Sequence, residues 1–319
     1  MRPTREHPGP PPLGEGLLRF TLAVRPPYRL DRTVSVLQRL PSSPVDVWSG
    51  GAYLRAFDGD AGPVAWRVVQ DPSGELLRVE LRGAAGPARP WRARLRRMLG
   101  LDVDLSEFEA IARATPALAP LAPLAEGLRP PRFAALHEAF ASVVLFQQVS
   151  LASGVAMLSR LVAALTAPVD AGGTFLRPFP PAEALAGAPD ALFRAAGLSA
   201  AKARSLRAAA RDVADGRLDD AGLRALPTPA LLDALRGRPG VGPWTASLLA
   251  LRYFGRLDVF PPGDVAAVKA LGEVGAERLV EQLGPWRGML YYLLFARRMA
   301  LAGAPAWRDA APGAITDRA

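Results

Sequence analysis

The sequence predicts an α+β domain followed by a longer all-α region, because the spacing of its apolar residues changes partway along the chain. Short segments that alternate between apolar and polar residues run from Leu17 to about residue 83, with Pro, Asp and Gly turns between them. Beyond residue 90 nearly every segment has the period of an amphipathic helix instead. We therefore predict a sheet domain over residues 17–88 and a helical region over 89–304, with a disordered tail at 1–16 and a C-terminal tail at 305–319.

Four segments of the first domain have the two-residue alternation of strands that are buried on one face. They are LRFTLAV at 18–24, AYLRAFDG at 52–59, VAWRVVQD at 64–71 and LLRVELRG at 76–83. The segment RTVSVLQRL at 32–40 has helical spacing and lies between the first two strands. The turn-rich run GAAGPARP at 83–90 marks the end of this domain.

Helical periodicity recurs throughout the second region. The helical segments are 91–100, 105–113, 133–167, 181–187, 189–196, 199–215, 229–236, 243–254, 264–271, 275–282 and 286–301. The third of these exceeds the usual length of a globular helix and carries Gln147, Gln148 and Ser150 near its middle. Ser150 is a favourable N-cap residue, so we expect a break there that presents two glutamines at a bend. A continuous core helix with the glutamines on its solvated face fits the same residues.

The charge of the chain favours a polyanionic partner. The chain has 39 basic and 30 acidic residues, a net charge of +9 and a pI near 10.8, a balance typical of proteins that bind nucleic acid. Only Lys202 and Lys269 are lysines, so 37 of the basic residues are arginine. The heavy use of Ala, Gly and Pro indicates a GC-rich coding bias, so arginine enrichment by itself does not indicate phosphate recognition.

Composition also excludes several classes of site. The chain has no cysteine, which excludes disulfides, thiolate zinc sites and cysteine-ligated iron–sulfur clusters. Its two histidines, His7 and His137, leave little for a histidine metal centre. We predict no catalytic metal and no organic cofactor. Because no apolar run reaches membrane-spanning length and the polar N-terminus does not resemble a signal peptide, we expect a cytoplasmic, nucleoid-associated protein.

A tight turn at Gly240, Val241 and Gly242 joins two helical segments and has the chemistry to hold a phosphate. Glycine permits positive φ and close approach of the backbone, and Pro243 presets the first turn of the following helix. Bare amide groups at a helix N-terminus bind phosphate without reading base sequence. Taken alone, however, a Gly-x-Gly turn is more often an ordinary helical hairpin.

A carboxylate follows this turn in the sequence. The helical segment 243–254 stops at Gly255, an extended stretch follows at 257–262, and Asp264 begins the next helix. Asp264 fits an ordinary N-cap. It also fits a carboxylate that faces a nucleotide whose backbone is held by the glycine turn.

Five separated segments together resemble the helix-hairpin-helix (HhH-GPD) DNA glycosylase superfamily, and within it the bacterial alkylpurine branch, 3-methyladenine DNA glycosylase II. The segments are LRGRPGVGPWTA at 235–246, DVFPPGD at 258–264, the wedge turn at 145–150, GLSAAKAR at 197–204 and PWR at 285–287. The resemblance implies an all-α helix-hairpin-helix glycosylase core of two helical lobes with a cleft between them. It also implies the additional N-terminal α+β domain of that branch.

The resemblance assigns roles to individual residues. Asp264 is the implied catalytic carboxylate at the end of the loop 257–264. Within this loop, Gly263 stands where close relatives carry a further Asp, and Asp258 has an implied structural rather than catalytic role. The residues implied to hold DNA phosphate are Gly240, Val241, Gly242, Trp244 and Thr245. Those implied to line the base pocket are Trp244, Leu248, Tyr291 and Phe295, with core packing an equal explanation for Tyr291, Tyr292 and Phe295. Gln148 is the implied wedge and Gln147 its neighbour, and the backbone carbonyls implied to hold a structural Na⁺ or K⁺ are those of Arg236, Arg238 and Gly240.

The implied activity is hydrolysis of the N-glycosidic bond of alkylated purines, of the 3-methyladenine and 7-methylguanine type, in double-stranded DNA by a monomer. Strand-cleaving relatives use a hairpin lysine where this chain has Trp244, and neither Lys202 nor Lys269 is placed to replace it. Leu248 and Phe295 depart from the aromatic residues of the family's pocket, so the lesion range stays open. Two other functions also stay open: a damage-sensing or DNA-bending protein without catalysis, and a glycosylase for deaminated or oxidised bases. An all-α interaction module without a DNA role is hard to reconcile with the charge and the ordered motifs.

Overall fold

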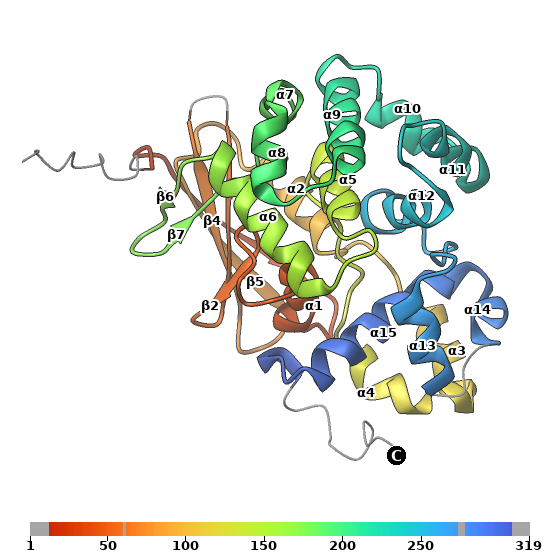
Figure 1. Cartoon of the computed structure of the whole chain (residues 1–319). Coiled ribbons are helices and arrows are strands. Elements are labelled where there is room, and N and C mark those ends of the chain that lie inside the picture. The colour runs from red at the N-terminus through yellow and green to blue at the C-terminus, as the bar shows by residue number, and fades with distance from the viewer. Residues whose placement is uncertain (1–12, 60–61, 274–277, 308–319) are drawn as a thin grey trace, which may run out of the picture.

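The computed structural model describes residues 13–59, 62–273 and 278–307, so most of the expected N-terminal tail lies outside the described residues. The first domain is built on an antiparallel sheet with the strand order β1-β5-β4-β3-β2 (Figure 1). Its strands are β1(Leu17–Ala23), β2(Val47–Ser49), β3(Ala52–Phe57), β4(Val64–Gln70) and β5(Leu76–Arg82). The four predicted strands are confirmed. β2 was not predicted, because three residues are too few to show an alternation.

The sheet is packed on both faces. On one face α1(Leu30–Gln38) and α2(Arg89–Met98) enclose a core that contains Trp66 and Leu77, both at most 1% exposed. On the other face Leu54 packs against Leu176 of a short hairpin formed by β6(Val169–Asp170) and β7(Phe175–Leu176). The second region therefore departs from the all-α prediction over residues 169–176, where two glycines with positive φ turn the chain.

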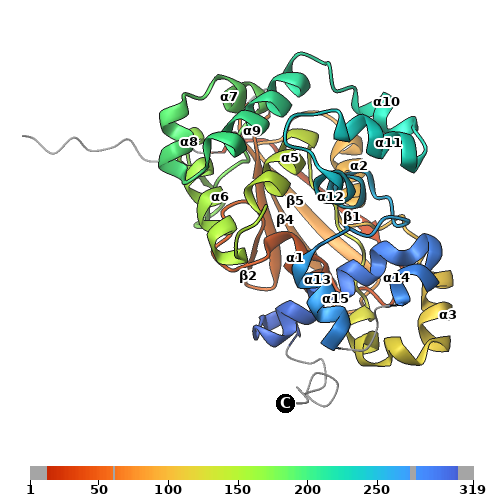
Figure 2. The ribbon, with the colours of Figure 1, turned by 45° about the vertical axis from the view of Figure 1, so that its right-hand side comes forward.

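The helical region forms two lobes that lie apart in both Figure 1 and Figure 2. The first lobe contains α5(Leu136–Leu145), α6(Leu151–Leu165), α7(Ala182–Gly187), α8(Asp190–Ala196), α9(Ala200–Ala214), α10(Asp220–Ala225), α11(Thr228–Arg236) and α12(Pro243–Leu249). The second lobe contains α3(Ser106–Ala114), η1(Pro116–Leu121), α4(Ala122–Ala125), α13(Val265–Glu273), α14(Leu279–Gln282), η3(Gly284–Trp286) and α15(Arg287–Leu301) around one apolar core. In the described parts of the chain, no helix is long and apolar enough to cross a membrane.

The long helical segment 133–167 is broken, as predicted. α5 ends at Leu145 and α6 begins at Leu151, where Ser150 Oγ accepts a hydrogen bond from the amide of Ser153 at 3.1 Å. Between the two helices Gln148 has a φ of 53°. The alternative of a continuous helix is therefore wrong. Because Leu145 belongs to α5, the turn itself comprises residues 146–150, and the name wedge turn refers to these residues from here on.

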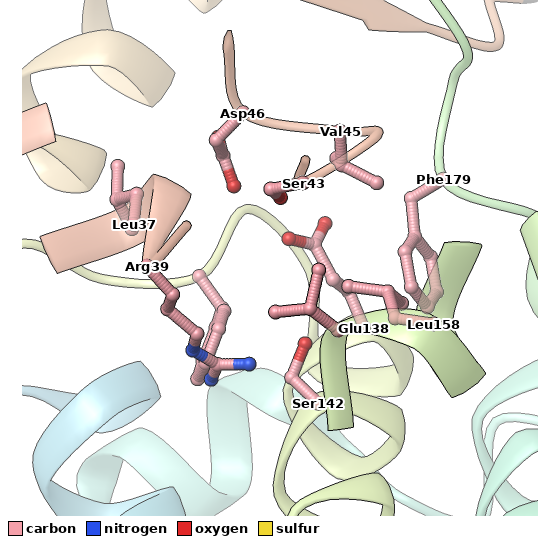
Figure 3. A pocket seen from close by; sticks show the side chains of 11 residues that line it. Leu37, Arg39, Ser43, Val45, Asp46, Glu138, Ser142, Leu158 and Phe179 are labelled. Atoms are coloured by element: carbon pink, nitrogen blue, oxygen red, sulfur yellow. The ribbon is translucent and has the colours of Figure 1, made fainter. Parts of the chain in front are cut away.

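A buried ion network ties α5 to the sheet. Arg55 of β3 is 1% exposed and pairs with Asp46, with 2.7 Å between Nη1 and Oδ1, and with Glu138 of α5. The hydroxyl of Tyr53 also donates to Asp46. Figure 3 shows the side chains of Asp46 and Glu138 turned toward the same small cavity. Because both carboxylates are buried, Arg55 fixes the position of α5 against the first domain.

The last described residues pack into the second lobe. η4(Pro305–Trp307) follows α15, and Trp307 is 2% exposed within the core of this lobe. Its Nε1 donates to Ser35 Oγ of α1 at 3.1 Å. Residues 305–307 are therefore part of the folded lobe rather than of the predicted C-terminal tail, because the large apolar side chain of Trp307 is buried there.

Candidate active site

Asp264 ends the loop that joins the two lobes. α12 continues as the π-helical turn η2(Ala250–Phe254), which stops at Gly255 with a φ of 76°. The loop then passes buried Val259 and turns at Gly263, whose φ of 68° suits glycine. Asp264 Oδ1 accepts the amide of Ala267 at 3.0 Å, so this carboxylate caps α13 as an N-cap residue does.

The other oxygen of Asp264 faces aromatic side chains from both lobes. Trp244 Nε1 on α12 donates to Oδ2 at 3.0 Å, and the hydroxyl of Tyr291 on α15 lies 3.5 Å from the same oxygen. Burial and the negative charge of Asp264 raise the pKa of Tyr291, so its hydroxyl stays protonated and can donate. The fold thus brings together three residues that the sequence analysis had placed in one site.

Two other pocket candidates lie one helical turn further along the same helices. Leu248 follows Trp244 by four residues and is 7% exposed within the core of the first lobe. Phe295 follows Tyr291 by four residues and is partly buried against the second lobe. Both side chains therefore lie on the faces that carry Trp244 and Tyr291, and both also contribute to core packing.

Phe260 is a further aromatic neighbour that the sequence analysis did not single out. Its ring packs edge-to-face against Tyr291, with 6.0 Å between the ring centroids. The signal for it was an aromatic residue inside the loop that carries the candidate carboxylate. Tyr292, in contrast, is fully buried and donates to the carbonyl oxygen of Pro131 at 3.0 Å, so it is a core residue.

Gln147 connects the wedge turn to the hairpin. Its Nε2 donates to the carbonyl oxygen of Gly240 at 3.2 Å and to Thr245 Oγ1 at 2.9 Å. Gln148 is exposed, and its positive φ places it at the tip of the turn. The two glutamines therefore differ: one is a structural tie and the other is free to meet a ligand.

Both lysines have identifiable surroundings. Lys202 Nζ donates to the carbonyl oxygens of Leu145 at 3.1 Å and of Gln147 at 2.8 Å, and so satisfies one carbonyl at the end of α5 and one in the wedge turn. The sequence analysis did not find this role. Lys269 on α13 is 78% exposed and lies 3.9 Å from Glu273.

The hairpin consists of buried supports and exposed backbone. Val241 and Thr245 are 7% and 3% exposed, so their side chains hold the turn in place from inside. The amide of Val241 donates to the carbonyl oxygen of Arg238 at 3.1 Å. Gly242 is exposed at the start of α12, and Gly240 has a φ of 74°. The surface that this turn offers to a ligand is therefore backbone rather than side chain.

Gly240→Ala is expected to destabilise the protein, whereas Gly242→Ala is not. A Cβ at Gly240 would lie 2.0 Å from Ser205 Oγ, on a backbone with positive φ, whereas a Cβ at Gly242 meets nothing within 4 Å. The strain should lower the free energy of unfolding by about 1–3 kcal/mol. Urea denaturation of both variants measures the difference. Equal stability of the two variants would contradict the close packing of the hairpin on α9.

Comparison with known proteins gives two family matches. Residues 19–135 match the AlkA N-terminal domain, and residues 141–279 match the HhH-GPD superfamily of base excision DNA repair proteins. The chain is similar to the probable bifunctional transcriptional activator/DNA repair enzyme AlkA of Mycobacterium tuberculosis, 35% identical over 204 residues. That match covers 61% of this chain and only 40% of the relative. The DNA-3-methyladenine glycosylase of Bacillus subtilis is 28% identical over 202 residues, which cover 61% of this chain and 67% of the relative.

Solved structures share the fold. The 3-methyladenine DNA glycosylase from Archaeoglobus fulgidus has a TM-score of 0.73 at 22% identity, with 88% of this chain and 98% of that chain covered. The 8-oxoguanine glycosylase/lyase of Clostridium acetobutylicum with DNA has a TM-score of 0.62 at 14% identity, with 82% and 99% covered. The two family matches follow one another along the chain: an AlkA-type N-terminal domain matches residues 19–135, and an HhH-GPD domain matches residues 141–279.

Proposed function

We propose that this protein is a DNA glycosylase that removes alkylated purines, of the 3-methyladenine and 7-methylguanine type, from double-stranded DNA. The observation that supports this most directly is the setting of Asp264, whose Oδ2 lies between Trp244 and Tyr291 from opposite lobes. A DNA-bending protein without catalysis has no use for a carboxylate held between aromatic rings. The similarity to the Bacillus subtilis DNA-3-methyladenine glycosylase supports the alkylpurine class.

The wedge turn is suited to displacing a nucleotide. A base inside duplex DNA must leave the stack before its glycosidic bond can be reached, at a cost of a few kcal/mol that damage reduces. Gln148 is exposed at the tip of the turn, where it would fill the gap and bond to the orphaned base. Because Gln147 ties this turn to Gly240, the hairpin and Gln148 approach DNA as one unit.

Asp264 is the residue that stabilises the charge formed during bond cleavage. As the bond from deoxyribose to the base lengthens, the sugar gains positive charge, which a nearby carboxylate stabilises. The donors Trp244 and Tyr291 hold this carboxylate in a fixed position, from which it can also orient the attacking water. A ring-alkylated purine is cationic and already a good leaving group, so aromatic faces suffice to bind it without a strong general acid.

The hairpin would hold the DNA backbone through its amides and through a monovalent cation. The carbonyl oxygens of Arg238 and Gly240 accept bonds from Val241 N and Gln147 Nε2, and each carbonyl oxygen retains a second lone pair. Together with the carbonyl of Arg236 they would hold Na⁺ or K⁺, which would bridge the turn to a phosphate when bound. The net charge of +9 supports DNA as the partner.

Wild-type protein is expected to free methylated bases from duplex DNA without cutting the strand. Lys202 Nζ is held by two carbonyl oxygens and Lys269 points to solvent, so neither is placed to form a Schiff base at the site. The measurement is chromatography of released base, together with borohydride trapping on the same DNA. An adduct that is trapped in wild type and lost in Lys202→Met would overturn the monofunctional assignment.

A further inference from the structure

Arg39 ends α1 in a rare backbone conformation. Its φ of 64° and ψ of −59°, with a 2.7 Å hydrogen bond from Leu40 N to the carbonyl oxygen of Gln38, define a strained γ-turn. Within the described ranges, Arg39 and Gln148 are the two non-glycine residues with positive φ. Strain of this kind persists where the surrounding fold imposes it, and it is common at ligand sites.

Among the described residues, the guanidinium of Arg39 has aromatic neighbours but no carboxylate partner. Its Cζ lies 3.9 Å from the ring centroid of Phe146 and 5.4 Å from that of Phe133. Figure 3 shows the side chain of Arg39 pointing away from the carboxylates of Asp46 and Glu138. Both of these carboxylates form ion pairs with Arg55 instead. In the described chain this partly buried guanidinium therefore has donors without an acceptor.

This unpaired cation lies close to the candidate active site. Phe146, on which it stacks, is the first residue of the wedge turn. The positive charges of Arg39 and Arg252 act on the hydroxyl of Tyr291 and oppose the rise in its pKa, and that hydroxyl contacts Asp264. Burial and the charge of Arg252 lower the pKa of Arg39 to about 9, so Arg39 is still a cation at neutral pH.

We propose that Arg39 selects the lesion by donating a hydrogen bond to a carbonyl oxygen of the flipped base. This inference rests on the proposed glycosylase function. When a bound base covers Arg39 and excludes water from it, a donor left without an acceptor disfavours a base that cannot pair with it. Bases with a ring carbonyl, such as hypoxanthine and 7-methylguanine, would satisfy Arg39. Cationic 3-methyladenine has no carbonyl oxygen and would leave the donors of Arg39 unpaired, whereas 7-methylguanine, which is also cationic, has a carbonyl oxygen that accepts from them.

Arg39→Met tests this assignment, because methionine keeps an apolar side chain against Phe146 and removes every donor. The substrates are a duplex with one hypoxanthine and a methylated duplex that contains 7-methylguanine and 3-methyladenine together. The variant is expected to excise hypoxanthine at least about tenfold more slowly. It should also lower the ratio of released 7-methylguanine to 3-methyladenine, with 3-methyladenine release unchanged or faster. Thermal unfolding of the variant checks that the fold is intact.

Arg94→Met is the matched control. Arg94 lies over Trp91 at 5.1 Å and over Phe57 at 5.2 Å, likewise without a carboxylate partner in the described ranges. It lines a groove at the start of α5, about 15 Å from the wedge turn by the rise of the helix. This variant should keep the wild-type rates and the wild-type ratio.

Three outcomes would overturn the proposal. An unchanged ratio and an unchanged hypoxanthine rate in Arg39→Met would exclude base recognition by Arg39. An equal loss on all bases, with weaker abasic-DNA binding and a smaller salt dependence, would assign Arg39 to a backbone phosphate. A ratio of released 7-methylguanine to 3-methyladenine that is higher in Arg39→Met than in wild type would mean that Arg39 disfavours the base with the carbonyl oxygen, the opposite of the proposal. If wild type released no base at all, the glycosylase function itself would fail.

Discussion

Asp264→Asn is expected to release methylated bases about 10²- to 10³-fold more slowly than wild type and to bind abasic-site DNA as tightly. Asparagine is a good N-cap, so its single amide oxygen can keep the bond from the amide of Ala267 and hold α13 in place, whereas its NH₂ group faces Trp244 Nε1 and cannot accept from it. What the variant lacks is the negative charge opposite the cationic sugar. Single-turnover base release and fluorescence anisotropy with abasic duplex measure the two properties.

Asp258→Asn provides the control for this experiment. Asp258 lies in the same loop, is exposed, and undergoes the same change of charge. It should release base at the wild-type rate. If Asp264→Asn kept a rate within about threefold of wild type, Asp264 would not be the reacting carboxylate. If wild type and variant both bound damaged DNA and neither released any base, the damage-sensing function would replace the catalytic one.

Arg55→Met is expected to lower the free energy of unfolding by about 3–5 kcal/mol, because it leaves two buried carboxylates without their cation. Asp46 and Glu138 have side chains only 7% and 4% exposed, so water cannot take the place of Arg55. Urea denaturation at neutral pH measures the loss. Arg19→Met is the matched control, since Arg19 is 69% exposed in its pair with Glu80 and should cost less than about 1 kcal/mol.

The loss in Arg55→Met should shrink as the pH falls. Burial raises the pKa of Glu138, and Arg55 opposes that rise, so removing Arg55 raises this pKa further. The folded variant then binds a proton that the unfolded chain has released above about pH 4.3, and its stability therefore increases as the pH decreases toward that value. Denaturation at pH 8 and at pH 5.5 should differ in this direction. A loss that did not depend on pH would exclude Glu138 as the uncompensated charge.

The features that the sequence predicted are those that local residues determine. The break at Ser150 and the turn at Gly240 depend on a capping hydroxyl and on glycine conformation, which act over a few residues. The strands of the first domain were visible because they alternate over six or seven residues. The hairpin at 169–176 and β2 are too short to show a period.

The features that the sequence did not predict depend on contacts between distant segments. The stacking of Arg39 on Phe146 and the hydrogen bonds of Lys202 to the end of α5 join elements that are far apart in the chain. The ion network of Arg55 likewise needs the sheet to be placed against α5. In the site itself, motif order placed Asp264, Trp244 and Tyr291 together, whereas Phe260 became apparent only when the loop was seen to fold back on Tyr291.

The second lobe has a consequence for how the chain is made. Its core joins residues 105–128 to residues 267–307, with the entire first lobe between them in sequence. On the ribosome, α3 and α4 emerge long before the helices against which they pack, and their apolar faces stay uncovered until residues 267–307 have been synthesised. Loss of only the last turn around Trp307 would expose part of that core and remove the hydrogen bond from Trp307 to Ser35 of α1. The completion of the candidate active site is therefore a late event in the folding of the nascent protein, since Tyr291 and the cap of Asp264 on α13 belong to this lobe.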